Sequence, residues 1–441
     1  MRGVFPRLRA HHGSPFLQKA RHAAYPRLRA TEATEPAESL TDSWYGAVQC
    51  PPAGGTGLPR GEGAFNGWAE ARSAVSSNRE SFEDLVRSGR LHLQRSSLFD
   101  LAPGPMPPDF DFSRVEGMML GLPIGDALGN TSEGILPEER SRQHGEIRDY
   151  LPNRYAGGRA VGLPSDDTQL AFWTLERILE DGGVDPERLA EHFAGNRTFG
   201  IGSAVREFVG RYSSGSPWFE CGQPSAGNGA LMRIAPVRIP HLKTGSADLW
   251  VDTALAASVT HNDPGSTAAC VAFVSILWGL LTMSRPPEPG WWVERYVEVA
   301  RGIEGDAEHA SRSGAFADYR GSVWRFVAEM VPKAHAEGLS VRDACNRWYS
   351  GAYLLETVPC LLYILMQYAD DPEAAIVRAV NDTLDNDTVG AIVGAAVGAL
   401  HGKQSLPERW ITGLLGRTSE ADDGWVSELL ARARDFVAAQ G

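Results

Sequence analysis

The stretch NDTLDNDTVGAIVGAAVGAL, residues 381–400, places three aspartates within seven residues and then becomes almost wholly apolar. The triplet Asn-Asp-Thr occurs twice before the apolar part begins. Gly390, Gly394 and Gly398 recur every four residues, a spacing that lies on one helix face. Because glycine has no side chain, a second helix can approach that face closely. The stretch therefore predicts a buried helix that carries acids at its N-terminal end.

A second acidic motif, PSDDTQL at 164–170, also precedes an apolar helix pattern. A third stretch, GMMLGLPIGDALGNTSEG at 117–134, is punctuated by glycines and ends near Glu133. Acids at a helix start can cap the free N–H groups and suit the helix dipole, and one acid is enough for that. Adjacent acids repel one another unless a cation lies between them. Capping and metal binding are therefore the two interpretations of these motifs.

The side chains that the three stretches offer are all oxygen donors, with no His or Cys among them. They are Glu133, Ser165, Asp166, Asp167, Asp385, Asp387 and Thr388. Ligation by oxygen alone favours Mg²⁺ or Mn²⁺ over Zn²⁺, and this number of carboxylates suits two ions better than one. Their separation along the chain is no objection, because helix bundles gather acids from several helices. The second Asn-Asp-Thr triplet supplies donors, whereas Asp382 in the first is expected to be a turn or cap residue.

Helical periodicity runs through the chain from about Glu116 onward. The stretch TQLAFWTLERILEDGG at 168–183, for example, has apolar residues at helical spacing and ends in two glycines. Six further stretches show the same pattern, and the period-two alternation of strands is nearly absent. We therefore predict an all-α fold, a compact multi-helix domain of about ten or more helices, with an irregular N-terminal extension.

The first part of the chain differs in composition from the rest. We predict a disordered extension, first basic and then rich in Pro and Gly, at 1–63, a partly helical extension and linker at 64–112, and the main helical domain at 113–441. Residues 1–30 hold seven basic side chains and no acid, and FPRLRA recurs there as YPRLRA. A targeting peptide, a polyanion-binding tail and residues upstream of the true start are the alternatives. The segment LAPGPMPPDFDF at 101–112, with four prolines, is the expected domain boundary.

The composition limits the classes of partner. With a formal net charge of −13 the chain is a poor non-specific nucleic-acid binder, although the basic arm keeps nucleic acid open as a partner. Five widely spaced cysteines indicate a reducing compartment, and we expect a cytoplasmic monomer. The longest apolar run, at 268–283, is shorter than the roughly 20 residues that a membrane span needs.

From about Glu116 to about Arg417 the sequence resembles the ADP-ribosylglycohydrolases, a family that includes dinitrogenase-reductase-activating glycohydrolase and the ADP-ribosyl-acceptor hydrolases. Seven blocks match in the family's order: GMMLGLPIGDALGNTSE, SDDTQLA, FGIGSAV, GNGALMRIAPV, SVTHNDP, LLETVPCLLY and AVNDTLDNDTVGAIVGAAVGAL. The resemblance implies that 113–441 is the catalytic domain and that it holds two Mg²⁺ or Mn²⁺ ions. The seven oxygen donors named above carry over as the metal ligands, with Ser165 where the family usually has Thr.

The resemblance also implies an ADP-ribose site. The residues that it assigns to ligand binding are Gly200, Gly202 and Ser203 in the diphosphate loop FGIGS, Gly227, Asn228, Gly229 and Met232 in GNGALMR, and His261. Without the resemblance, Gly200, Gly202 and Gly229 can be explained as plain turns, and a helix cap is the preferred explanation of His261. The chain departs from the family at Thr383 and Leu384, where two glycines are usual, and the region 284–350 is poorly matched.

The expected reaction is hydrolysis of the bond between ADP-ribose and an acceptor, with Asp166, Asp167 or Glu133 as the general base. Arginine-linked ADP-ribose on a protein is the first choice of substrate, and serine-linked, O-acetyl and nucleobase-linked ADP-ribose remain open. An inactive ADP-ribose-binding or structural relative is one alternative. A di-metal phosphoesterase acting on nucleotides is the other.

Overall fold

The computed structural model describes residues 72–440, with side chains from Asn78 onward. The extension predicted at 1–63, and the first residues of the segment predicted at 64–112, lie outside the described residues. Within them, none of the helices is long and apolar enough to cross a membrane.

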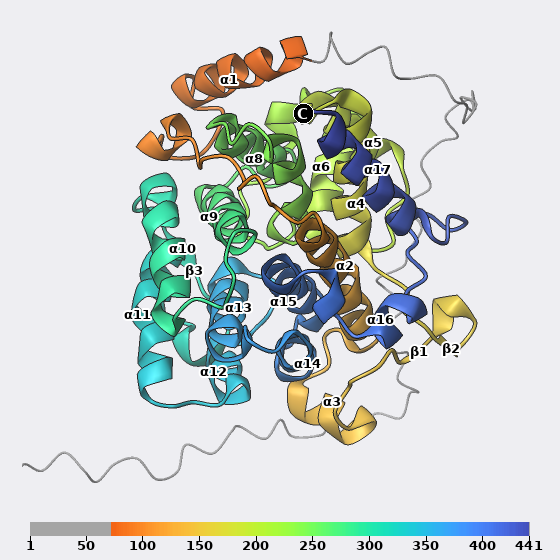
Figure 1. The fold of residues 1–441 in the computed structure, drawn as a ribbon. Helices are drawn as coiled ribbons and strands as arrows, with labels where there is room; N and C mark the ends of the chain where they lie inside the picture. Colours follow the sequence, from red (N-terminus) through yellow and green to blue (C-terminus); the bar gives the residue numbers. More distant parts are fainter. Residues whose placement is uncertain (1–71, 441) are drawn as a thin grey trace, which may run out of the picture. The chain divides into compact units, whose positions relative to one another are not determined.

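Helices dominate the part of the chain that the structure describes, which confirms the predicted all-α class (Figure 1). The first nine are α1 (Arg72–Arg87), α2 (Ser113–Gly129), α3 (Pro137–His144), α4 (Asp166–Asp181), α5 (Pro186–Gly195), α6 (Ser203–Ser213), α7 (Trp218–Cys221), α8 (Asp248–Ser258) and α9 (Pro264–Leu280). The others are α10 (Pro289–Glu304), α11 (Val323–Ala336), α12 (Val341–Trp348), α13 (Leu354–Tyr368), α14 (Pro372–Asp382), α15 (Asn386–His401), α16 (Glu408–Gly413) and α17 (Trp425–Ala439). Two short antiparallel pairs join β1 (Pro152–Asn153) to β2 (Arg159–Ala160) and β3 (His309–Ala310) to β4 (Arg320–Gly321).

Helix α15 lies at the centre of the packing, against α2, α14, α13 and α9 (Figure 1). Every residue from Asn386 to Leu400 is buried, so the apolar stretch of the sequence forms the core helix that its composition predicts. A helix that is apolar all round can be stable only when neighbours cover all of its faces.

Glycines set the distance between α2 and α15. A methyl group added at Gly121 would lie 2.0 Å from the carbonyl oxygen of Gly394, and one added at Gly398 would lie 2.0 Å from that of Gly117. At the far end, a methyl group on Gly129 would lie 2.5 Å from Cα of Asp387. The two backbones therefore touch along the whole contact, and the contact ends where α15 carries its first acid.

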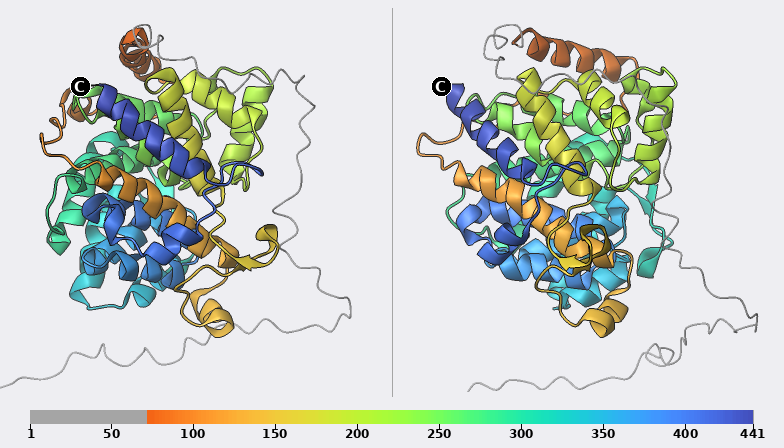
Figure 2. Two further views of the ribbon diagram at one scale, coloured as in Figure 1. Left: turned by 45° about the vertical axis from the view of Figure 1, so that its right-hand side comes forward. Right: turned by 90° about the vertical axis from the view of Figure 1, so that its right-hand side faces the viewer.

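The residues before α2 pack against the helical domain. Phe82 of α1 and Phe99 are fully buried, and α1 lies along α8 (Figure 2). Asn78 donates hydrogen bonds to Asp252 Oδ1 (2.8 Å) and to the carbonyl oxygen of Val184 (2.7 Å). The domain boundary at 101–112 stays a prediction, and the side chains on its N-terminal side belong to the same buried core.

Candidate active site

Six carboxylates gather where the ends of α2, α4 and α15 meet. Asp126, Asp167 and Asp387 each offer an oxygen atom, and these three atoms lie within 4.8 Å of one another. Glu133, Asp385 and Asp387 form a second group by the same measure, so Asp387 belongs to both. Asp166 lies beside them at the start of α4. We call these six side chains the acid cluster.

The packing of the helices explains why acids so far apart in sequence meet. Asp126 lies in the last turn of α2, and Glu133 follows that helix by four residues. Asp387 lies in the first turn of α15, directly against Gly129. Because glycine removes the side chains from the α2–α15 contact, the C-terminal end of α2 is brought up to the N-terminal end of α15. Helix α4 adds Asp166 and Asp167 from its first turn.

The capping interpretation does not account for these residues. Ser165 and Asp385 occupy the N-cap positions of α4 and α15, yet neither side chain accepts a hydrogen bond from its helix backbone. Ser165 Oγ instead donates to Asp126 Oδ1 at 2.8 Å and lies 3.3 Å from Asp167 Oδ2. The Ser165 hydroxyl is therefore directed towards the carboxylates of the cluster rather than towards the backbone N–H groups of α4.

Asp126 is a member of the cluster that the sequence analysis missed. It is fully buried and accepts hydrogen bonds from the backbone N–H and hydroxyl groups of both Ser165 and Thr168, and from the Asn130 amide. These bonds fix the start of α4 against α2. The available signal was an acid inside the apolar run LPIGDALG, where a carboxylate needs a buried role.

The cluster holds more negative charge than its own hydrogen bonds compensate. Burial and the Asp126 carboxylate hold the pKa of Asp167 well above its ordinary value, and burial together with Glu133 does the same for Asp387. Burial raises the pKa of Asp166 and of Asp385 to about 6. The pKa of Glu133 is also raised, because its carboxyl group is shielded from water and lies near Asp385. The residue as a whole is nevertheless exposed.

One oxygen of the cluster has no partner at all among the described residues. Asp167 Oδ1 is buried and accepts no hydrogen bond. A buried carboxylate oxygen without a donor is costly unless a cation or water satisfies it. The oxygen-only donor set, the two close groups and this unpartnered atom all fit a hard divalent cation.

Asn228 is the residue of the GNGALMR segment that reaches the cluster. Its side-chain amide donates to Asp385 Oδ2 at 2.5 Å and to Thr357 Oγ1 at 3.0 Å, and the residue is buried. The hydroxyl of Thr357 donates in turn to the carbonyl oxygen of Gly351. The predicted ligand-binding residue Asn228 therefore orients an acid of the cluster.

The loop FGIGS contacts the cluster at Asp166. A methyl group on Gly200 would lie 2.5 Å from Asp166 Oδ1, so a larger residue there would displace the Asp166 carboxylate. Gly202 has open space around its Cα and precedes α6, and Ser203 is exposed in the first turn of that helix. The loop thus presents backbone and free space immediately beside Asp166.

His261 packs against the glycines of the other segment. A methyl group on Gly229 would lie 2.9 Å from the imidazole Cε1, and one on Gly227 would lie 3.4 Å from Nε2. Burial and the Arg233 guanidinium lower the pKa of His261 to about 3, so its imidazole is neutral. Met232 is buried behind the same segment.

Two other predicted features can be placed. Asp382 forms ion pairs with Arg342 and Arg378 and belongs to neither carboxylate group, consistent with its expected role outside the site. Thr383 is fully buried and its hydroxyl donates to the carbonyl oxygen of Ala379. Leu384 is half-buried, directly before Asp385.

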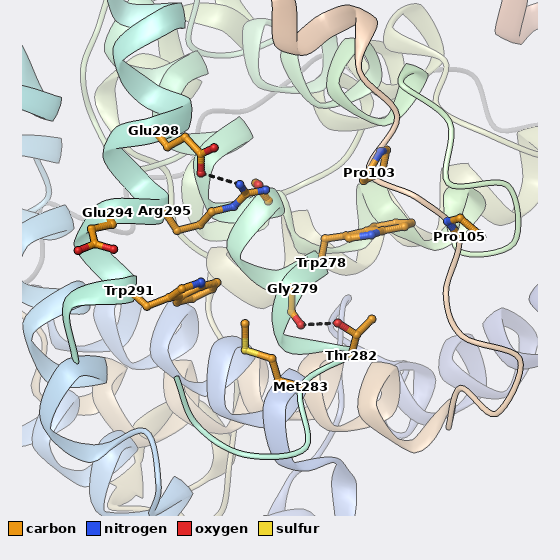
Figure 3. A pocket seen from close by; sticks show the side chains of 11 residues that line it. Pro103, Pro105, Trp278, Gly279, Thr282, Met283, Trp291, Glu294, Arg295 and Glu298 are labelled. Atoms are coloured by element: carbon orange, nitrogen blue, oxygen red, sulfur yellow. Dashed lines mark hydrogen bonds and ion pairs between the residues drawn. The ribbon is translucent and has the colours of Figure 1, made fainter. Parts of the chain in front are cut away.

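A separate hollow of about 520 Å³ lies between α9, α10 and the chain around Pro103 (Figure 3). Trp278 and Trp291 point into it, and Arg295 pairs with Glu298 at its edge at 2.7 Å. It shares no residue with the acid cluster.

Comparison with known proteins places the helices from α2 onward in one family. Residues 106–440 match the sequence profile of the ADP-ribosylglycohydrolases. The ADP-ribosyl-[dinitrogen reductase] glycohydrolase of Rhodospirillum rubrum is 26% identical over 328 residues, which cover 73% of this chain and 96% of that protein. The ADP-ribosylarginine hydrolase Tri1 of Pseudomonas putida is 27% identical over 321 residues, covering 69% and 75% respectively.

A solved structure described as an ADP-ribosylglycohydrolase-related protein complex shares the fold. It superposes with a TM-score of 0.52 at 24% identity, over 75% of this chain and 98% of that one. The sequence match extends over three-quarters of the chain and includes every helix that contributes to the acid cluster. The chain belongs to the ADP-ribosylglycohydrolase family of hydrolases.

Proposed function

We propose that this chain is a metal-dependent hydrolase that cleaves the glycosidic bond between ADP-ribose and an acceptor, with ADP-ribosyl-arginine in a protein as the first-choice substrate. The observation that carries the proposal is the acid cluster. Two groups of three carboxylates share Asp387, and neither group contains a His or Cys. Two ions that share one bridging carboxylate fit this arrangement, and Mg²⁺ and Mn²⁺ are the cations that such donors prefer.

The residues proposed to hold the ions are Asp126 in addition to the predicted set Glu133, Ser165, Asp166, Asp167, Asp385, Asp387 and Thr388. When bound, such ions would lower the pKa of water and polarise the oxygen atoms of the substrate. Asp126 also accepts six hydrogen bonds from Ser165, Thr168 and Asn130, so it fixes the start of α4 as well.

The chain's own residues supply the proton acceptor. Asp166, Asp167 and Glu133 are the candidates, and Asp166 is the one that lies outside both groups of three. Its carboxylate abuts Gly200, where the diphosphate loop would place the ribose end of the ligand. We therefore favour Asp166 as the group that takes the proton from the attacking water.

Backbone groups would hold ADP-ribose. The loop with Gly200, Gly202 and Ser203 lies beside Asp166 and leads into α6, and its backbone N–H groups are the ones proposed to bind the diphosphate. The segment with Gly227 and Gly229 packs on His261, and because neither glycine has a side chain, its backbone can approach the imidazole closely. His261 is neutral and therefore adds no charge to the ligand site.

The choice of arginine as acceptor rests on the named relatives. One is a glycohydrolase of ADP-ribosylated dinitrogen reductase, and the other is an ADP-ribosylarginine hydrolase. A protein substrate, a monomeric state and a cytoplasmic location belong to the same proposal.

The test is a release assay with arginine-, serine- and nucleobase-linked ADP-ribose, with and without Mg²⁺ or Mn²⁺. The proposal expects free ADP-ribose, released fastest from arginine and only when metal is present. AMP or phosphate as the product would identify a phosphoesterase instead. Tight binding of ADP-ribose without release from any substrate would identify an inactive, ligand-binding relative.

A further inference from the structure

Arg140 of α3 is a buried cation directly beneath the acid cluster, and it has no assigned role. It is fully buried. Its Nη1 donates to the carbonyl oxygens of Val380 (2.9 Å) and Thr383 (2.7 Å). Its Nη2 donates to those of Ser132 (3.2 Å), Ile135 (2.8 Å) and Leu384 (3.4 Å). Every one of these acceptors is a backbone carbonyl, and none is a carboxylate.

Four of the five carbonyls belong to two loops, and each of these loops carries an acid of the group Glu133–Asp385–Asp387; the fifth, that of Val380, lies in the last turn of α14. Ser132 and Ile135 flank Glu133, and Thr383 and Leu384 directly precede Asp385. A further bond joins the same loops, since the N–H of Gly134 donates to the carbonyl oxygen of Leu384. The guanidinium therefore holds the Glu133 loop against the Asp385 loop. Its planar fork can donate to both loops at once, whereas the single ammonium group of a lysine cannot.

The charge of Arg140 is also unusual for its location. A buried cation is expensive unless an anion compensates it, and its Nε has no hydrogen-bond partner among the described residues. Burial lowers the pKa of Arg140 to about 10, so it stays charged at neutral pH, and the Asp387 and Asp382 carboxylates act in the opposite direction. Asp382 is already paired with Arg342 and Arg378. The acid cluster is the surplus negative charge that remains nearby.

We propose that Arg140 is a positioning residue for the cation-binding group Glu133–Asp385–Asp387: it fixes the spacing of the two loops and supplies a built-in positive charge under the acids. This inference rests on the proposed metal site. The other group, Asp126–Asp167–Asp387, is held by Ser165, Thr168 and Asn130 and does not depend on Arg140. Loss of Arg140 should therefore weaken one ion much more than the other.

The test measures Mn²⁺ binding to the whole chain by calorimetry and by the electron paramagnetic resonance of free Mn²⁺. Arg140→Met keeps an unbranched side chain, shorter than arginine, without its charge or its fork, and we expect about 10–100-fold weaker binding of one of two ions, the usual effect of losing an outer partner of a metal ligand. The Mn²⁺ affinity of Arg140→Lys should lie between those of wild type and Arg140→Met. Arg342→Met is the matched control, because it removes a neighbouring arginine whose partner Asp382 keeps Arg378, and it should leave both affinities unchanged.

The outcomes separate this inference from the proposed function. Unchanged affinities in a folded Arg140→Met chain, with only a lower Tm, would show a purely structural role and overturn the inference. If that variant does not fold, Arg140→Lys decides, and wild-type affinities for both ions in it would have the same meaning. A wild-type chain that binds no Mn²⁺ would instead overturn the proposed function. The catalytic readout is a fall in kcat with little change in KM for the ADP-ribosylated substrate.

Discussion

Several helices of this chain begin at an aspartate or at a serine next to one. Some of these residues cap their helix, and others face the acid cluster. Asp185, Asp263 and Asp371 precede α5, α9 and α14, and each side chain accepts N–H groups of its own helix. Ser165 and Asp385 hold the same position before α4 and α15, and neither accepts such a bond. All five residues hold the N-cap position, and the direction of their side-chain oxygen atoms distinguishes a cap from a site.

The residue that follows marks the difference. Each of the three capping aspartates is followed by proline, at Pro186, Pro264 and Pro372, in the first turn of the helix. Proline suits that position because its missing N–H would be unpaired there anyway. The two site corners continue with more oxygen donors, as Asp-Asp-Thr and Asn-Asp-Thr. Caps use one acid to satisfy a backbone, whereas the site corners accumulate acids that face one another.

The largest expected effect comes from replacing an aspartate by alanine at the site and comparing the result with the same replacement at a helix cap. Asp387→Ala should reduce kcat by at least about 100-fold, since even an outer partner of a metal ligand is worth 10–100-fold. Asp371→Ala should leave kcat unchanged and lower the free energy of unfolding by about 1 kcal/mol, the usual value of a lost N-cap. Steady-state release assays and urea unfolding measure the two. Equal losses of activity would break the distinction between caps and site.

The second prediction concerns the contact that brings the corners together. Gly121→Ala would place a methyl group 2.0 Å from the carbonyl oxygen of Gly394, and it should cost about 3 kcal/mol or more, at or beyond the top of the range for overpacked cores. Gly210→Ala on α6 is the control, because nothing lies within 4 Å of the added group. That change should stabilise by about 0.4–1 kcal/mol. Thermal unfolding compares them, and a neutral Gly121→Ala would contradict the close approach of α2 and α15.

The third prediction uses pH on the metal-free chain. The pKa of Asp166 and of Asp385 is raised from 3.8 to about 6, so the folded state binds protons more tightly than the unfolded state. Their contribution to stability is therefore present below about pH 4 and is lost as the pH rises through 6. Asp166→Asn/Asp385→Asn should equal wild type at pH 4 and exceed its free energy of unfolding at pH 7.5 by about 3 kcal/mol for each substituted group. Urea unfolding in chelator measures this, and saturating Mn²⁺ should reverse the order.

The smallest expected effect belongs to Asp382, in the first of the two Asn-Asp-Thr triplets. Asp382→Asn removes the ion pairs with Arg342 and Arg378, both of which stay partly in contact with solvent. We expect a loss of about 1 kcal/mol in the free energy of unfolding, as for partly exposed pairs, and no change in kcat or in Mn²⁺ affinity. A loss of turnover comparable to that of Asp387→Ala would show that the first Asn-Asp-Thr triplet also belongs to the active site.

The all-α class and the central buried helix could be predicted because periodicity and glycine spacing are local properties of the sequence. The gathering of Glu133, Asp167, Asp385 and Asp387 could be expected from the surplus of acids at two helix starts, and the structure brings their oxygens close together. The assignment of these residues as metal ligands stays a prediction.

What the sequence hid depends on tertiary contacts. Asp126 stands alone inside an apolar helix, so no neighbouring acid marked it. Arg140 lies in the polar stretch PEERSRQH, which is typical of an exposed helix, and it is buried only because α3 folds against the loop before α15. Asn228 was expected near the ligand. Its bonds to Asp385 and to Thr357 of α13 are tertiary contacts, which the sequence pattern does not show.

The most direct test of the central claim is the number of Mn²⁺ ions bound by the wild-type chain and by Asp387→Ala, measured by calorimetric titration after removal of metal. Because Asp387 belongs to both carboxylate groups, the account predicts two ions for wild type and a loss of affinity at both positions in the variant. Asp371→Ala should match wild type. Equal binding by wild type and Asp387→Ala, or no binding by either, would contradict the account.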